Sequence, residues 1–204
     1  MWYIMDAEPG AQLVYGLKPG TTKKMFEDAI ASGTVEDLMN YVDVKKGDVY
    51  FIPAGQVHAI GRGILISEIQ QNCNVTYRVY DYNRKQPDGS LRQLHTKKAL
   101  DVIVSRTEEE INRIRFSKPI RTSGEVLGSC EYFTSVKHNI ERELELKTGK
   151  KSFMSLLFLE ADAACILFKG RKIRVRKGDS LFIPADMGRF LVRGKCELIA
   201  TTVN

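Results

Sequence analysis

A twelve-residue stretch from Gly47 to His58 constrains the fold of this chain more than any other part of its sequence. It reads Gly-Asp-Val-Tyr-Phe-Ile-Pro-Ala-Gly-Gln-Val-His, which is a turn, a short apolar strand, a second turn and a histidine. Gly47 permits the backbone of a tight turn, and Pro53 ends the strand because it cannot donate a hydrogen bond to a neighbour. A histidine directly after the chain reversal begins the returning strand, which is how a β-barrel directs a metal ligand into its interior.

The same stretch occurs a second time near the end of the chain. Residues 177–186, KGDSLFIPAD, match residues 46–55, KGDVYFIPAG, at nearly every position. A repeat of this kind predicts two copies of one β unit. The second copy has Arg189 at the position of His58, so we expect the chemistry of the histidine only in the first copy.

The remaining pattern predicts a mainly β protein with one helical insertion. Short apolar strands separated by turn residues recur between 131 and 203, whereas residues 21 to about 41 show helical spacing, with Thr21 and Thr22 as caps and Gly33 as the stop. We predict two β-barrel units, the first over residues 1–104 with the insertion and the second over residues 129–204. The polar residues 105–128 are interpreted as the connection between them.

Composition excludes several classes of function. The chain has 204 residues and a net charge of +6, but its densest basic run, residues 171–177, alternates with apolar residues as an exposed strand face does. No nucleic-acid-binding motif accompanies it, so we expect no nucleic-acid partner. The four cysteines form no metal-binding pair, and the longest apolar run is interrupted by Glu160 and Asp162. We therefore expect no membrane partner and a cytoplasmic protein.

The spacing of Gly47, Pro53, Gly55 and His58 resembles the second sequence motif of the cupin barrels, in which that histidine binds a metal. The similarity extends over the whole chain to the type I mannose-6-phosphate isomerases in their short bacterial form. It is carried by three runs in the order and spacing of that family: KGDVYFIPAGQVHAIGRGILISEIQQNCNVTYRVYDYNR, LHTKKALDVI and KGDSLFIPA. The resemblance implies jelly-roll barrels, a zinc cofactor, a phosphorylated hexose substrate, and interconversion of mannose 6-phosphate and fructose 6-phosphate.

Residue by residue, the resemblance implies that His58 is a zinc ligand and that Arg78 is the active-site arginine. Aldose–ketose isomerisation passes through an enediolate, and a metal ion together with a guanidinium stabilises its negative charge without titrating near neutral pH. The alternation of residues 75–82 predicts a strand that carries Arg78 on the same polar face as Thr76 and Tyr80.

Three further residues are candidates for the site. Glu68 is predicted to share a strand face with Ile64 and Ile66, which would place a carboxylate among apolar neighbours. Its position resembles an active-site acid of the family that orients the sugar or transfers a proton, and a salt bridge with Arg78 is the alternative. Arg84 and Lys85 are candidates for binding the substrate phosphate, although cations in loops are usually only solvated.

The sequence departs from the family at its beginning. The family's other metal ligands, in a histidine-containing strand and a glutamate, precede the segment that resembles Trp2–Ile4. We therefore interpret the chain as the C-terminal two thirds of an isomerase, either active only when completed or a non-catalytic sugar-binding or structural cupin. A metal-dependent oxygenase is less favoured, because His95 and His138 are poorly placed for it. The first barrel is expected to be incomplete, with an open edge beside Trp2–Met5 through which the chain forms a homodimer.

Overall fold

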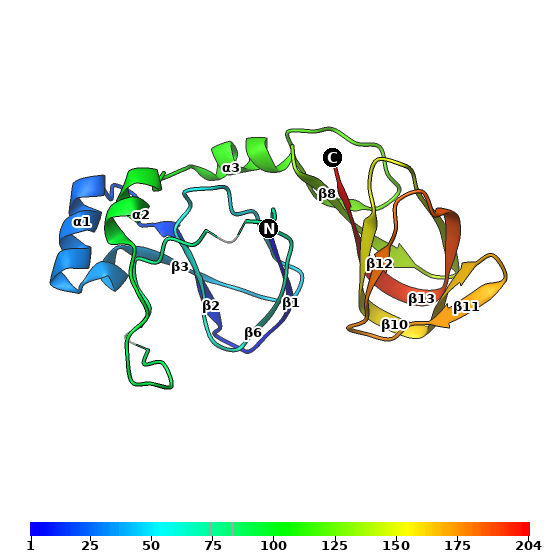
Figure 1. The fold of residues 1–204 in the computed structure, drawn as a ribbon, viewed down its shortest axis with the longest axis horizontal. Helices are drawn as coiled ribbons and strands as arrows, with labels where there is room; N and C mark the ends of the chain where they lie inside the picture. Colours follow the sequence, from blue (N-terminus) through cyan, green and yellow to red (C-terminus); the bar gives the residue numbers. More distant parts are fainter. Residues whose placement is uncertain (74, 83) are drawn as a thin grey trace. The chain divides into compact units, whose positions relative to one another are not determined.

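The structure is a computed structural model that describes residues 1–73, 75–82 and 84–204, and its chain divides into two compact units, Met1–Ile111 and Asn112–Asn204. Both units contain antiparallel sheets, and over the whole chain strands exceed helices, which confirms the predicted mainly β class (Figure 1). The boundary between the units falls within the predicted connection. That segment contains helix α3 (Glu108–Arg115) and most of strand β7 (Glu125–Ser129).

The first unit is built on two three-stranded antiparallel sheets. One sheet has the order β4 (Val49–Tyr50), β1 (Trp2–Ala7), β6 (Ile64–Glu68), and the other has the order β3 (Met39–Asp43), β2 (Gln12–Leu17), β5 (His58–Ile60). Trp2 and Ile4 from the first sheet and Leu13 from the second are buried in one apolar cluster. This cluster is the interior of the first barrel.

The helical insertion packs on the opposite face of β2. Helix α1 (Lys23–Ser32) begins where the Thr22 side chain accepts a hydrogen bond from the Met25 N–H, and it ends at Gly33, whose φ of 76° suits glycine. The predicted cap at Thr22 and the predicted stop at Gly33 are therefore confirmed, whereas the Thr21 hydroxyl donates to the Lys18 carbonyl instead. The rest of the insertion is shorter than predicted, because only the 3₁₀ turn η1 (Val35–Leu38) follows before β3 begins. Helix α2 (Thr96–Val102) also packs with one face against the insertion, and together they form a second apolar core. The buried residues of this second core are Val14, Phe26, Val35, Met39 and Leu100.

The second unit is one larger antiparallel sheet that curls around an apolar core. Its strand order is β11-β10-β13-β8-β7, with β12 also paired to β10 and β9 to β13. Besides β7, its strands are β8 (Phe133–Ile140), β9 (Glu143–Thr148), β10 (Met154–Phe168), β11 (Arg171–Arg174), β12 (Ser180–Ile183) and β13 (Gly188–Val203). Leu156, Phe158, Val192 and Leu198 in its core are completely buried.

The two repeated stretches occupy equivalent positions, as the repeat predicts. In the first copy the Gly47 N–H donates to the Ile4 carbonyl at 2.8 Å, and the Ile4 N–H donates to the Asp48 carbonyl at 2.9 Å. The second copy makes the same two bonds, at 2.8 and 3.0 Å, with residues at matching positions: Gly178, Phe158 and Asp179. Ile4 of β1 therefore corresponds to Phe158 of β10.

The expectation of an open edge beside Trp2–Met5 is wrong. Strand β1 is hydrogen-bonded on both sides, to β4 and to β6, so it lies in the centre of its sheet. The reason is that β6, more than fifty residues further along the chain, returns beside it. The homodimer inferred from this edge loses its structural basis. Among the described residues, no helix is long and apolar enough to cross a membrane.

Candidate functional site

Trp2 brings the predicted metal ligand and the predicted acid together. Its indole Nε1–H donates a hydrogen bond to Glu68 Oε1 at 3.0 Å, from the neighbouring strand position of the same sheet. The rings of Trp2 and His58 pack edge to face, with centroids 5.4 Å apart and planes at 70°. His58 belongs to β5 of the other sheet, so Trp2 links both sheets at the mouth of the barrel.

The strand register explains why Glu68 reaches this place. Ile64 and Ile66 pack against the barrel core, and Glu68 follows on the same face of β6 as predicted by alternation. Glu68 is the last residue of its strand and is exposed, so its carboxylate is not surrounded by apolar side chains as expected. Its partner is the indole of Trp2, and the predicted alternative of a salt bridge with Arg78 is not what the structure shows.

His58 is oriented by the backbone of the preceding turn. Its Nδ1 lies 2.7 Å from the carbonyl oxygen of Gln56. Because a carbonyl only accepts, Nδ1 carries the proton in this bond, which leaves the lone pair on Nε2. Such a fixed imidazole can bind a metal ion or accept a hydrogen bond from a sugar hydroxyl.

The described residues do not complete a metal site around His58. A catalytic zinc ion typically has about three protein ligands, and within residues 1–73, 75–82 and 84–204 no group of three His, Cys, Asp or Glu side chains is placed to hold a metal. Glu68 is already bonded to Trp2. Around His58 the described residues offer one imidazole ligand, and they therefore do not fit a tightly bound zinc ion.

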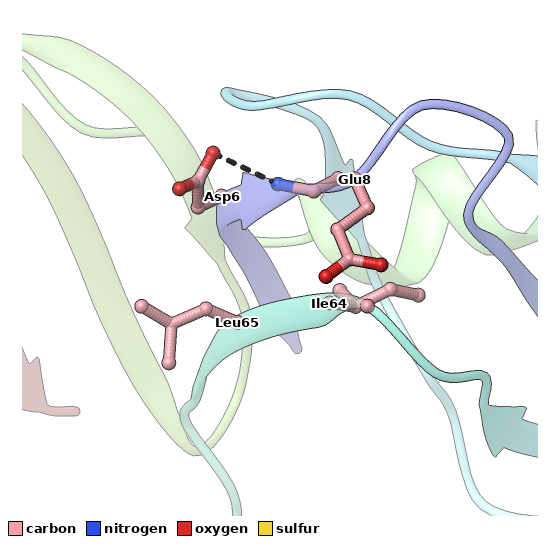
Figure 2. A pocket seen from close by; sticks show the side chains of 6 residues that line it. Asp6, Glu8, Ile64 and Leu65 are labelled. Atoms are coloured by element: carbon pink, nitrogen blue, oxygen red, sulfur yellow. Dashed lines mark hydrogen bonds between the residues drawn. The ribbon is translucent and has the colours of Figure 1, made fainter.

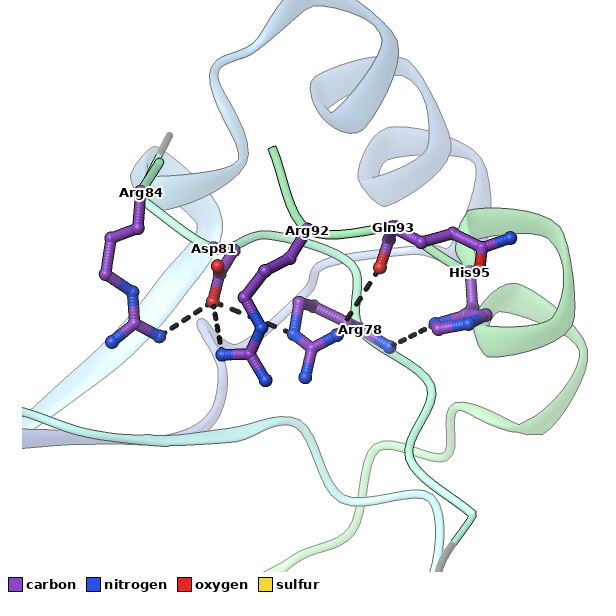
Figure 3. A network of polar contacts seen from close by, with 6 residues as sticks. All are labelled: Arg78, Asp81, Arg84, Arg92, Gln93 and His95. Carbon is purple, nitrogen blue, oxygen red and sulfur yellow. Dashed lines mark hydrogen bonds and ion pairs between the residues drawn. The ribbon is translucent and has the colours of Figure 1, made fainter. Parts of the chain in front are cut away.

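Arg78 and Arg84 meet at a carboxylate that the sequence did not single out. Asp81 Oδ1 lies 2.7 Å from Arg84 Nη2, 3.4 Å from Arg92 Nη1 and 3.7 Å from Arg78 Nε (Figure 3). Its other oxygen, Oδ2, is buried without a hydrogen-bond partner among the described residues. The hydrogen bond from Arg84, supported by all three positive charges, holds the pKa of Asp81 below its usual value against the opposing effect of burial. We refer to Arg78, Arg84 and Arg92 around Asp81 as the arginine cluster.

The predicted strand over residues 75–82 is wrong, because this segment is irregular. A strand requires a partner that supplies regular ladder bonds, and alternation in the sequence cannot show whether one is present. Here the His95 N–H donates to the Arg78 carbonyl at 2.7 Å, and the Arg78 N–H donates to the ring Nδ1 of His95 at 3.3 Å. The Arg78 guanidinium also donates to the Gln93 carbonyl at 3.4 Å. These bonds fix Arg78 without a strand.

A tight turn carries the other cations. Lys85 and Leu91 form an isolated antiparallel bridge that closes the turn between them, and this turn brings Arg92 back toward Arg84. Sequence reasoning missed Arg92 because the contact depends on that return. The Lys85 side chain is exposed in the same turn, so of the two phosphate candidates the cluster contains Arg84.

A pocket at the opposite end of β1 does not match a sugar phosphate. It is lined by Asp6, Ala7, Glu8, Gly63, Ile64 and Leu65. Figure 2 shows the Asp6 carboxylate, which accepts the Ala7 N–H at 3.0 Å, and the Glu8 carboxylate, which lies toward Ile64. Two acidic side chains repel a phosphate dianion, so this pocket is not the predicted site.

Comparison with known proteins shows which enzymes this chain resembles. Residues 124–203 match the family described as mannose-6-phosphate isomerase, cupin domain. The mannose-6-phosphate isomerase ManA of Bacillus subtilis is 36% identical over 201 residues, which is 98% of this chain. Over nearly its whole length this chain is similar to mannose-6-phosphate isomerases. The mannose-6-phosphate isomerase of Streptococcus mutans is 33% identical over 205 residues.

The fold is shared with a solved structure as well. The crystal structure of the Bacillus subtilis mannose-6-phosphate isomerase superposes with a TM-score of 0.81 and 32% identity over 98% of this chain. The predicted cupin fold is thereby confirmed. The chain spans 62% of the length of the Bacillus subtilis relative and 63% of that of the Streptococcus mutans relative.

Proposed function

We propose that this chain carries active-site residues of a mannose-6-phosphate isomerase, which interconverts mannose 6-phosphate and fructose 6-phosphate. The observation that carries the proposal is the meeting of His58 and Glu68 at Trp2, in a chain 36% identical to a curated isomerase of that name. The substrate is a phosphorylated hexose.

The proposed chemistry moves one proton between C1 and C2 of the open-chain sugar. Glu68 is exposed and its carboxylate is oriented by the indole N–H, so it can approach a sugar hydroxyl or the transferred proton. Arg78, whose side chain is only 20% exposed and is held from two sides, supplies a permanent positive charge for the enediolate. Arg84 supplies a cation for the phosphate.

Zinc dependence is part of the proposal and rests on the resemblance. When bound, a zinc ion supplies a Lewis acid that polarises the sugar carbonyl, and His58 would provide one of its ligands through Nε2. No further ligand for it is identified among the described residues. The zinc-dependent reaction therefore requires ligands in addition to those seen here.

A second candidate function is a sugar-phosphate-binding cupin without turnover. It is favoured by the metal-ligand count in the part of the chain that the structure describes. A single comparison distinguishes the two functions. An isomerase converts mannose 6-phosphate in a coupled assay. A binding protein does not convert it, and sugar binding only changes the fluorescence emission of Trp2, the one tryptophan of the chain.

The deciding experiment measures both properties in the wild-type chain, in Arg78→Ala and in Glu68→Gln. Arg62→Ala is the control, because it removes the same charge from an exposed turn. Where the wild-type chain turns over mannose 6-phosphate with excess zinc added, we expect Arg78→Ala to reduce that turnover about a hundredfold or more, the effect of losing one preorganised transition-state donor. Binding without turnover in every form of the chain supports the second function, and neither binding nor turnover refutes both.

A further inference from the structure

The arginine cluster has more positive charge than its own carboxylate neutralises. Three guanidiniums surround one aspartate, which leaves a surplus of two positive charges within one short segment of the chain. A phosphate monoester carries about −1.5 to −2 charges at neutral pH. The surplus therefore matches the charge of one phosphate dianion.

The geometry of the ion pairs differs from that of a purely structural salt bridge. An arginine that only neutralises a carboxylate typically pairs both of its parallel N–H groups with both oxygens. Here all three arginines approach the same oxygen, Oδ1, and Oδ2 stays buried and unpartnered within the described structure. Asp81 thus positions the three guanidiniums through one oxygen, without forming a bidentate pair with any of them.

The cluster is also open on one side. Asp81 is 8% exposed, whereas the side chains of Arg84 and Arg92 are 63% and 42% exposed. A buried anion therefore anchors two cations whose side chains stay partly exposed to solvent; Figure 3 shows how they converge on Asp81. A guanidinium presents five N–H donors in a fixed plane, which suits bidentate binding of phosphate.

We propose that Arg92 and Arg84 form the phosphate-binding site of this chain and that Asp81 is the positioning residue that holds both arginines and Arg78 in place. The identity of the ligand, a sugar phosphate, rests on the proposed function. The site itself requires only a phosphate dianion. Arg92 supplies a second fork beside Arg84, and Asp81 restricts rotamers that long, exposed arginine side chains would otherwise sample.

The role of Asp81 makes an unusual prediction. Replacing Asp81 with asparagine removes a negative charge beside the ligand, which by Coulomb attraction alone would strengthen phosphate binding. If Asp81 positions the arginines, Asp81→Asn instead weakens it. The sign of the change therefore separates positioning from simple charge.

The experiment measures binding by calorimetry of inorganic phosphate, mannose 6-phosphate and neutral mannose to the wild-type chain and its variants. We expect Asp81→Asn and Arg92→Ala each to lower the affinity for inorganic phosphate and for mannose 6-phosphate about tenfold, the effect of one charged hydrogen bond. Arg92→Lys keeps the charge but loses the forked guanidinium, so its phosphate affinity should lie between those of the wild type and Arg92→Ala. Arg171→Ala, which removes an exposed arginine from β11 of the other unit, should leave phosphate binding unchanged.

Each outcome decides the proposal. Wild-type phosphate binding that Asp81→Asn and Arg92→Ala weaken, with Arg171→Ala unaffected, supports it even if the chain catalyses no isomerisation. Failure of the isomerase assay alone therefore removes the proposed function and leaves the phosphate site. Tighter binding in Asp81→Asn, an equal loss in Arg171→Ala, or no phosphate binding by the wild-type chain overturns it. Should Asp81→Asn fail to fold by circular dichroism, the order of wild type, Arg92→Lys and Arg92→Ala decides instead.

Discussion

Trp2 and Glu68 face each other across β1 and β6, and the indole N–H of one is bonded to the carboxylate of the other. Because Ile4 corresponds to Phe158, the equivalent pair in the second unit is Leu156 and Ala200, which also face each other. The same architectural position is therefore polar in one unit and apolar in the other. This difference explains why the chemically suggestive residues gather only in the first barrel.

Replacing Trp2 should separate packing from hydrogen bonding. Trp2 is 2% exposed, so Trp2→Ala removes a large buried ring and should lower the free energy of unfolding by about 3–5 kcal/mol. Trp2→Phe keeps most of the packing but loses the donor to Glu68, and we expect a loss of about 1–2 kcal/mol. Urea denaturation followed by circular dichroism measures both. A loss in Trp2→Phe as large as in Trp2→Ala would contradict this division.

The metal content of the chain provides a second prediction. One imidazole does not hold zinc tightly against water, and binding is strong only when several ligands are preassembled. We expect well below one zinc ion per chain after dialysis, and no change in that ratio on replacing His58 with alanine. Atomic absorption of both proteins measures it. Stoichiometric zinc in the wild type that His58→Ala abolishes would show that further ligands of this chain had been overlooked.

Local patterns were predictable from the sequence, whereas pairing between distant segments was not. The caps at Thr22 and Gly33 and the common face of Ile64, Ile66 and Glu68 depend on neighbouring residues and were predicted correctly. The predicted strand at 75–82 and the open edge at β1 failed, because each depends on which remote segment supplies hydrogen bonds. The repeat was the exception. Because residues 46–55 and 177–186 have nearly the same sequence, the equivalence of these two distant stretches could be predicted.

His138 should make the second unit sensitive to acid. It is 7% exposed on β8, and burial lowers the pKa of its imidazole. Between its unfolded pKa, about 6.5, and the lower folded pKa, the unfolded chain binds more protons than the folded one, so stability falls as the pH falls. His138→Gln should flatten this dependence between neutral pH and about pH 5. Thermal unfolding at several pH values tests it, and an unchanged slope in the variant would assign the acid sensitivity to other groups.

The candidate site was only partly predictable for a related reason. His58 could be identified from four residues in one stretch, since the motif itself specifies the turn that orients the imidazole. Asp81 and Arg92 carry no such local signature. Their contact arises because the turn after Lys85 reverses the chain, and the two partners are eleven positions apart in the sequence. The sequence indicated the cations but not the carboxylate that gathers them.

The second turn of each repeat provides a matched test of how space and backbone strain combine. Gly55 and Asp186 occupy the same position with φ values of 85° and 59°, so both copies have left-handed backbone there. A Cβ at Gly55 would lie 2.4 Å from the Val102 carbonyl oxygen, which ordinary van der Waals contact does not allow. Gly47 also has a positive φ, 96°, but nothing lies within 4 Å of its Cβ position.

We therefore expect three different outcomes from three small substitutions. Gly47→Ala introduces only backbone strain and should cost about 1–2 kcal/mol. Gly55→Ala adds a clash with backbone and should cost clearly more, about 3 kcal/mol or above. Asp186→Gly relieves strain while increasing the entropy of the unfolded chain, so its net effect should stay within about 1 kcal/mol. Urea midpoints of the three variants establish the order. Equal costs for Gly47→Ala and Gly55→Ala would mean that the segment around Val102 moves to accommodate the methyl group.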